Sequence, residues 1–211
     1  MDFILTNLAF VIIPFVYMTL VFIGKVIEKN QIFFVVLAIV LSMLAYVIQG
    51  QFIEWTIFSG QFSLALFMLV IFAGLMPKKS MYRQVIEPVR GDLSIYGFIY
   101  LIPHLAFNFS KMLDGYNIIG LVAYIIMIPL IVTSFRQVRR NLQPKMWLMM
   151  HKLSYLIYLL LYLHVGFSFW LSPLSLSIKP LSMPFHITLI FYVSIKMMYM
   201  IINMNEKKRA L

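Results

Sequence analysis

The chain has 211 residues, of which 63% are hydrophobic and 11% charged, whereas soluble proteins contain about 45–50% apolar and about 25% charged residues. A soluble domain of this length has too little interior to bury so much apolar surface, which excludes a water-soluble enzyme. The net charge of +10 would suit nucleic acid or anionic lipid, and the positions of the basic residues decide between them. The absence of cysteine excludes disulfides, thiolate metal sites and iron–sulfur clusters.

Apolar runs separated by short polar loops follow one another along the chain, and each predicts a transmembrane helix. They cover residues 3–24, 32–48, 62–76, 92–110, 118–135, 148–171 and 182–203. A helix needs about 20 residues to cross a bilayer core of about 30 Å, so the short second and third runs require semi-polar residues at their ends. No basic stretch precedes the first run, which we therefore expect to remain as a helix rather than to be cleaved as a signal peptide. The predicted fold is an all-α, polytopic membrane bundle of seven transmembrane helices.

Basic residues occupy alternate loops of this bundle. If the N-terminus lies outside, the inner loops and tail carry Lys25, Lys29, Lys78, Lys79, Arg83, Arg90, Arg136, Arg139, Arg140, Lys145, Lys207, Lys208 and Arg209. The outer loops carry only Lys111 and Lys179. Positive charge collects on the cytoplasmic side, so we expect the N-terminus outside and the C-terminus inside. The basic residues are then topology determinants that meet anionic lipid, and no nucleic-acid partner is required.

His104 and His164 fall within predicted spans, where ionisable residues are rare and commonly functional. At 1.5 Å per residue they lie about 18 and about 24 Å from the inner ends of the fourth and sixth runs, both in the outer half of the membrane. Two neutral imidazoles at one depth on separate helices predict a bis-histidine haem site. Gly97 shares the helix face of His104 and would leave room for a flat macrocycle. In the alternative interpretation, the two histidines bond to each other or to Asn108 in a polar core.

The other two histidines have several interpretations. His151 lies about 20 Å before His164, near the inner end of the sixth run, on a stripe with Tyr155, Tyr158 and Tyr162. It would ligate a second haem, line a quinone or flavin pocket, or simply pack; an ideal helix turns it about 220° away from His164, so a shared face requires a bend or a π-bulge. His186, near the outer end of the last run, would contact a haem propionate, receive an external electron carrier, or lie at the lipid interface.

Motifs for other chemistries are absent from the sequence. There is no G-x-G-x-x-G after a strand, no P-loop and no H-E-x-x-H. The acidic residues lie in loops or at the ends of runs, which argues against a proton-relay transporter and against acid–base chemistry inside the bundle. A nicotinamide or FAD domain is missing, so any electron donor must be a separate partner.

Several residues together resemble the ferric-reductase-like transmembrane domain, and within it most closely the haem-binding membrane subunit of the periplasmic methionine sulfoxide reductase system. They are Arg90 to His104, Thr133-Ser134, and the set Trp147, His151, Tyr155 and His164. The resemblance covers roughly residues 32–200. It divides the chain into an additional N-terminal helix and loop (1–31), a haem-binding six-helix core (32–203) and a basic cytoplasmic tail (204–211).

This resemblance implies b-type haem on His104 and His164, with His151 as a third haem-associated residue. It implies electron entry from a cytoplasmic-side quinol or reduced flavin such as FMN, and exit to an extracytoplasmic redox protein, across a prokaryotic plasma membrane. Members that reduce iron or oxygen carry a second histidine where this chain has Arg90 or Gly91. One haem is therefore implied, and a second only if His151 is a ligand.

The sequence thus predicts a multi-pass membrane cytochrome b, an electron-transfer subunit of an oxidoreductase system. Arg90 and the neighbouring cationic loop are expected to hold haem propionates or an anionic donor. One alternative is a non-redox membrane protein, a small-solute permease or assembly factor with structural histidines, which would purify colourless. Another is a haem chaperone or exporter, which would bind haem substoichiometrically and release it to apoprotein.

Overall fold

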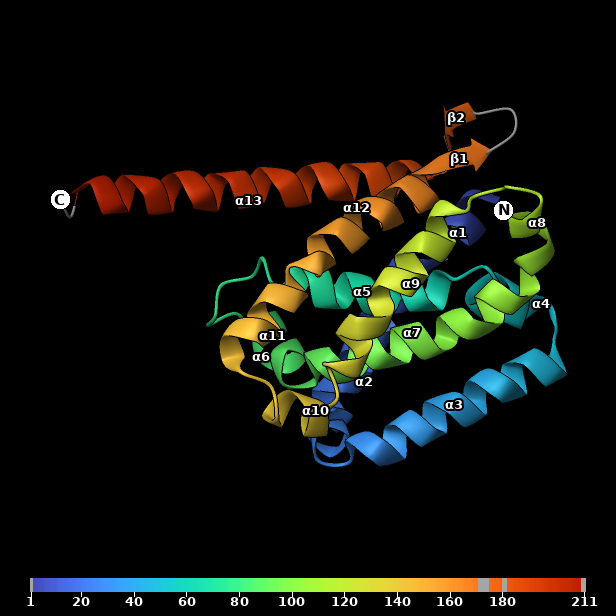
Figure 1. Cartoon of the computed structure of the whole chain (residues 1–211), viewed down its shortest axis with the longest axis horizontal. Helices are drawn as coiled ribbons and strands as arrows, with labels where there is room; N and C mark the ends of the chain where they lie inside the picture. Colours follow the sequence, from blue (N-terminus) through green and yellow to red (C-terminus); the bar gives the residue numbers. More distant parts are fainter. Residues whose placement is uncertain (1, 171–174, 180–181, 210–211) are drawn as a thin grey trace.

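The computed structural model of the chain describes residues 2–170, 175–179 and 182–209. It is a helical bundle with one small β-hairpin (Figure 1). In chain order the elements are α1 (Asp2–Thr6), α2 (Leu8–Lys29), α3 (Gln31–Ile48), α4 (Gln51–Ile53), a π-helical turn (Glu54–Phe58), α5 (Gln61–Ala73), α6 (Met81–Ile86), a 3₁₀ turn (Glu87–Val89), α7 (Arg90–Phe107), α8 (Phe109–Leu113), α9 (Ile119–Val132), α10 (Arg136–Arg140), α11 (Pro144–His151), α12 (Leu153–Gly166), β1 (Phe167–Trp170), β2 (Ser175–Ile178) and α13 (Met183–Arg209).

Five helical segments in the described part of the chain are long and apolar enough to cross a membrane. They are Leu8–Lys29, Gln31–Ile48, Gln51–Ala73, Pro144–Gly166 and Met183–Ile202. The two remaining predicted runs also form helices, but α9 has only 14 residues, and the 18 residues of α7 include a charged first turn and His104. The all-α class and the apolar spanning helices are therefore confirmed, with five candidate spans.

The sixth predicted run ends differently from the prediction. Helix α12 stops at Gly166, and the next four residues form β1, which pairs antiparallel with β2 so that Phe167 lies opposite Ile178. The prediction of one helix through residue 171 is wrong because Phe167–Trp170 reads F-S-F-W, an alternation of period two that favours a strand. Gly166 also lies close to α13: a Cβ there would be 2.8 Å from His186 Cε1. Along α13, residues 204–209 of the predicted tail continue the helix.

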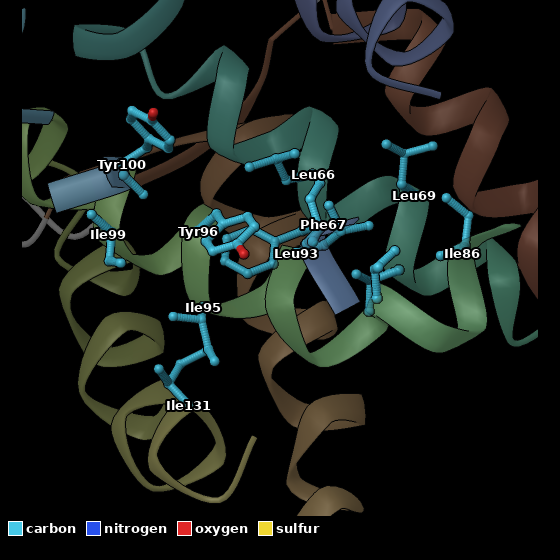
Figure 2. Close-up of a cluster of buried hydrophobic side chains, with 14 of the residues drawn as sticks. Leu66, Phe67, Leu69, Ile86, Leu93, Ile95, Tyr96, Ile99, Tyr100 and Ile131 are labelled. Atoms are coloured by element: carbon cyan, nitrogen blue, oxygen red, sulfur yellow. The ribbon is translucent and has the colours of Figure 1, made fainter. Parts of the chain in front are cut away.

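Helix α5 is the centre of the bundle. In its spanning segment 67% of the residues are buried, against 28% for α3, 17% for α2 and none for α13. Its side chains Leu66, Phe67 and Leu69 pack against Leu93 and Tyr96 of α7 (Figure 2). The outer faces of α2, α3 and α13 expose many large apolar side chains. Because lipid tails are as apolar as leucine, such an exterior suits a bilayer.

A polar network ties together the end of the bundle that carries α6, α10 and α11, called here the α10 end (Figure 1). Asp92, in the first turn of α7, is 1% exposed. Its carboxylate accepts hydrogen bonds from Gln31 Nε2 at 2.5 Å and Arg136 Nη2 at 2.6 Å. Gln31 Oε1 in turn accepts the Arg136 backbone N–H at 3.0 Å. This network joins α3, α7 and α10.

Candidate functional site

The structure brings the rings of His104 and His164 together, edge to face. The first projects from α7 and the second from α12, and their ring centres lie 6.1 Å apart with an interplanar angle of 85°. Both line a cavity of about 520 Å³, a volume within the about 300–1,000 Å³ range of small-molecule and cofactor sites. The cavity lies toward the end of the bundle that carries α8 and the β-hairpin, called here the hairpin end (Figure 1).

A backbone carbonyl orients the His104 ring. Nδ1 of His104 lies 2.6 Å from the carbonyl oxygen of Phe58, the last residue of the π-helical turn. A carbonyl can only accept, so Nδ1 carries the proton and Nε2 is left with its lone pair. Asn108 Nδ2 donates to the same carbonyl at 3.2 Å. Asn108 therefore steadies the carbonyl that positions His104, and the two histidine rings do not hydrogen-bond to each other within the described residues.

The backbone around His164 is held from outside α12. Its carbonyl oxygen accepts hydrogen bonds from Asn117 Nδ2 at 3.3 Å and from Lys179 Nζ at 3.1 Å. Asn117 also exchanges hydrogen bonds with the backbone of Phe169 in β1. The hairpin and the loop before α9 thus fix the end of α12. The imidazole Nδ1 of His164 is buried and has no hydrogen-bond partner among the described residues.

Two glycines make room for the two imidazoles. A Cβ at Gly60 would lie 3.3 Å from His104 Nδ1, and a Cβ at Gly120 would lie 2.6 Å from His164 Nδ1. Gly97, which the sequence analysis places beside His104, has a different neighbour, since a Cβ at Gly97 would lie 3.0 Å from Phe67 Cζ. Gly97 does not line the cavity. The expected space beside His104 therefore comes from Gly60, which is 44 residues away in sequence, while Phe67 occupies the space at Gly97.

Substituting Gly120 tests this close packing. In Gly120→Ala the new methyl group forces the His164 ring to move, and overpacking of this kind costs about 1–3 kcal/mol. Gly24→Ala is the matched control, because Gly24 also lies in a helix but a Cβ there would meet nothing within 4 Å. For this variant we expect the free energy of unfolding to stay the same or to rise by about 0.5–1 kcal/mol. Thermal unfolding in detergent measures both. Equal unfolding temperatures for the two variants would contradict the packing at Gly120.

His151 belongs to a second cavity. This cavity, of about 230 Å³, lies at the α10 end and is also lined by Arg90, Arg139, Trp147 and Tyr158. His151 Nε2 is 3.4 Å from the Thr133 hydroxyl, and its ring centre is 4.3 Å from that of Trp147. The helix breaks here, since α11 ends at His151 and α12 begins two residues later. The structure therefore separates His151 and Arg90 from the facing histidine pair.

Among the residues that the structure describes, only Phe67 and Met127 line both cavities. They come from α5 and α9, so these two central helices form the partition between the site at the hairpin end and the one at the α10 end.

His186 lies outside both linings. Its Nδ1 is 3.0 Å from the Tyr162 hydroxyl and its Nε2 is 3.3 Å from Ser182 Oγ, so both ring nitrogens have partners. The tyrosine stripe predicted around His151 does not form one surface: Tyr155 is 57% exposed, Tyr158 lines the second cavity and Tyr162 contacts His186.

Comparison with known proteins yields one distant relative. An uncharacterized protein of Treponema pallidum (strain Nichols) is 29% identical over 123 residues, which cover 52% of this chain and 34% of that protein. The chain thus spans about a third of the length of this relative. No family model and no solved structure matches the chain. Within the described residues, no three His, Asp or Glu side chains gather as ligands for a metal ion.

Proposed function

We propose that this protein is a membrane b-type cytochrome that holds haem between His104 and His164. The observation that carries the proposal is the 6.1 Å separation of the two ring centres beside a cavity of about 520 Å³. An imidazole nitrogen binds a transition metal at about 2.0–2.1 Å, so two imidazoles can hold one metal only when their rings lie close together. The observed spacing meets that condition.

The hydrogen bonds of the pair support the same assignment. Metal-binding histidines commonly donate their second N–H to a backbone carbonyl, as Nδ1 of His104 does to Phe58. Gly60 and Gly120 leave a close-fitting space beside each ring. In the described part of the chain the hydrogen bonds of the His104 ring involve Nδ1, which leaves its Nε2 for a ligand.

The chain's own residues would give the bound group its position and surroundings. Haem would supply the one-electron chemistry. His104 and His164 would supply two nitrogen ligands, and apolar neighbours such as Leu161 and Met127 would keep the cavity dry. Lys111 and Lys179 line the same cavity and would pair with the two carboxylates of the group.

Electrons would cross from the α10 end to the hairpin end. We infer seven spans, formed by the five longer segments together with α7 and α9, and an N-terminus outside. Four arginines support this orientation because they gather at the α10 end: Arg83, Arg90, Arg136 and Arg139. The donor would be a cytoplasmic-side quinol or reduced flavin, and the acceptor an extracytoplasmic redox protein.

An optical spectrum tests the proposal. Protein purified in detergent from haem-replete cells is expected to show a low-spin b-type spectrum, oxidised and dithionite-reduced, with one haem per chain. A ratio of two would add a haem at His151. A colourless protein would overturn the proposal and leave a small-solute permease or assembly factor. Substoichiometric haem that transfers to apoprotein would indicate a haem chaperone instead.

The orientation has its own test, since the chain contains no cysteine. Single-cysteine variants Asp114→Cys and Arg140→Cys place a thiol at exposed positions on either side of α9. We expect a membrane-impermeant maleimide to label the first in intact spheroplasts and the second only after permeabilisation. Labelling of both in intact spheroplasts would show that α9 does not cross the membrane.

A further inference from the structure

The cavity at the α10 end is lined by two arginines, Arg90 and Arg139, that form no ion pair with a carboxylate in the described part of the chain. The two carboxylates at the same cavity, Asp92 and Glu87, each pair with a different arginine, at N–O distances of 2.6 and 2.7 Å. The hydrogen bond from Arg83 holds the pKa of Glu87 below its usual range, so this carboxylate stays ionised and paired with Arg83. Arg90 and Arg139 therefore remain available to an anion.

Arg139 is oriented without using its N–H groups. Its guanidinium carbon lies 4.3 Å from the centre of the Trp147 ring. Stacking on an aromatic face fixes the plane of a guanidinium and leaves its edges free to donate hydrogen bonds, two at a time, to oxygen atoms of an anion.

Trp147 adds a donor of its own. Its indole nitrogen Nε1 is buried and has no acceptor among the described residues, although Trp147 lines the cavity. A buried N–H normally has a partner, so an acceptor is expected at this position. Two guanidinium groups and one indole N–H around one cavity match a ligand that offers several oxygen acceptors and negative charge.

We infer that this cavity binds a phosphate group. Its volume of about 230 Å³ is below the about 300–1,000 Å³ of pockets for drug-sized ligands, which favours a headgroup-sized anion over a large planar molecule. Arginine forks match phosphate oxygens in geometry as well as charge. The phosphate comes either from an anionic phospholipid of the adjacent leaflet, as in other basic pockets between membrane helices, or from a free phosphate compound. The inference extends beyond the proposed haem function and uses neither His104 nor His164.

Thermal unfolding of the full-length protein in neutral detergent tests the inference, with phosphatidylglycerol, phosphatidylcholine or inorganic phosphate as the added probe. We expect phosphatidylglycerol to raise the unfolding temperature and phosphatidylcholine to leave it unchanged. Arg139→Ala is expected to weaken the apparent affinity for phosphatidylglycerol about tenfold or more. Arg140→Ala is the matched control: it removes the same charge from the same helix, is exposed and does not line the cavity, so its affinity should change less than about twofold.

A second variant separates binding from folding. Trp147→Phe keeps a ring beneath Arg139 but removes the indole N–H, so its affinity for phosphatidylglycerol should fall while its unfolding temperature without lipid stays the same. Stabilisation by inorganic phosphate alone, lost in Arg139→Ala, would identify a free phosphate compound as the source. No stabilisation by either probe, or equal weakening in Arg139→Ala and Arg140→Ala, would overturn the inference. None of these readouts depends on haem.

Discussion

Replacing His104 or His164 with alanine is expected to abolish the low-spin b-type spectrum, whereas replacing His186 leaves it intact. A six-coordinate haem needs an axial ligand on each side, and each alanine variant lacks one of them. His186 is the matched control because both of its ring nitrogens already bond to other side chains, Tyr162 and Ser182. Reduced-minus-oxidised spectra and haem per chain measure the effect, and we expect the low-spin bands to disappear in both ligand variants.

The same experiment can contradict the assignment. If His104→Ala and His164→Ala both retain the low-spin bands, the facing pair does not ligate haem. If His151→Ala alone removes them, the haem site lies in the cavity at the α10 end. Size-exclusion chromatography of each variant separates loss of the ligand from loss of the fold.

Removing the Asp92 carboxylate should have the largest effect on stability. We expect Asp92→Ala to lower the free energy of unfolding by about 3 kcal/mol or more, because it removes two hydrogen bonds to a charged group, at about 1.5–3 kcal/mol each, and leaves the buried Gln31 amide without its acceptor. Asp92 is 1% exposed and accepts hydrogen bonds from Gln31 and Arg136. Its loss also removes the hydrogen bonds that join α7 to α3 and to α10, whereas the bond between Gln31 and the Arg136 backbone remains.

Glu87→Gln is the matched control for Asp92→Ala. Glu87 also pairs with an arginine, Arg83, at 2.7 Å, but its side chain is 54% exposed. Surface ion pairs contribute about 0–1 kcal/mol, so we expect little change. Unfolding in a titration with a denaturing detergent compares the two variants. A similar decrease in the free energy of unfolding in both variants would show that burial does not govern the strength of these ion pairs.

Much of the site could be predicted because membrane thickness constrains helix length. A helix that crosses about 30 Å of hydrocarbon rises 1.5 Å per residue, so the depth of a residue follows from its position in an apolar run. That reasoning placed His104 and His164 at comparable depth, and the structure brings their rings to 6.1 Å. The same reasoning placed His151 far from His164, and the structure gives it a separate cavity.

Contacts between distant segments could not be predicted in the same way. The Phe58 carbonyl that orients His104, the close fit of Gly60 and Gly120, and the occupation of the Gly97 space by Phe67 all join helices far apart in the chain. They depend on the angle and register at which two helices pack, and the sequence of an apolar run does not indicate which helix it packs against.

Composition and apolar runs were therefore sufficient to predict a helical bundle with helices long enough to cross a membrane and two histidines at comparable depth, since both follow from local periodicity and bilayer dimensions. Only the tertiary structure revealed the Gln31–Asp92–Arg136 network, the hairpin after Gly166 and the division into two cavities. The network and the two cavities arise where side chains from three or more elements meet, and the hairpin requires β1 to pair with β2, so none of them is a property of one segment alone.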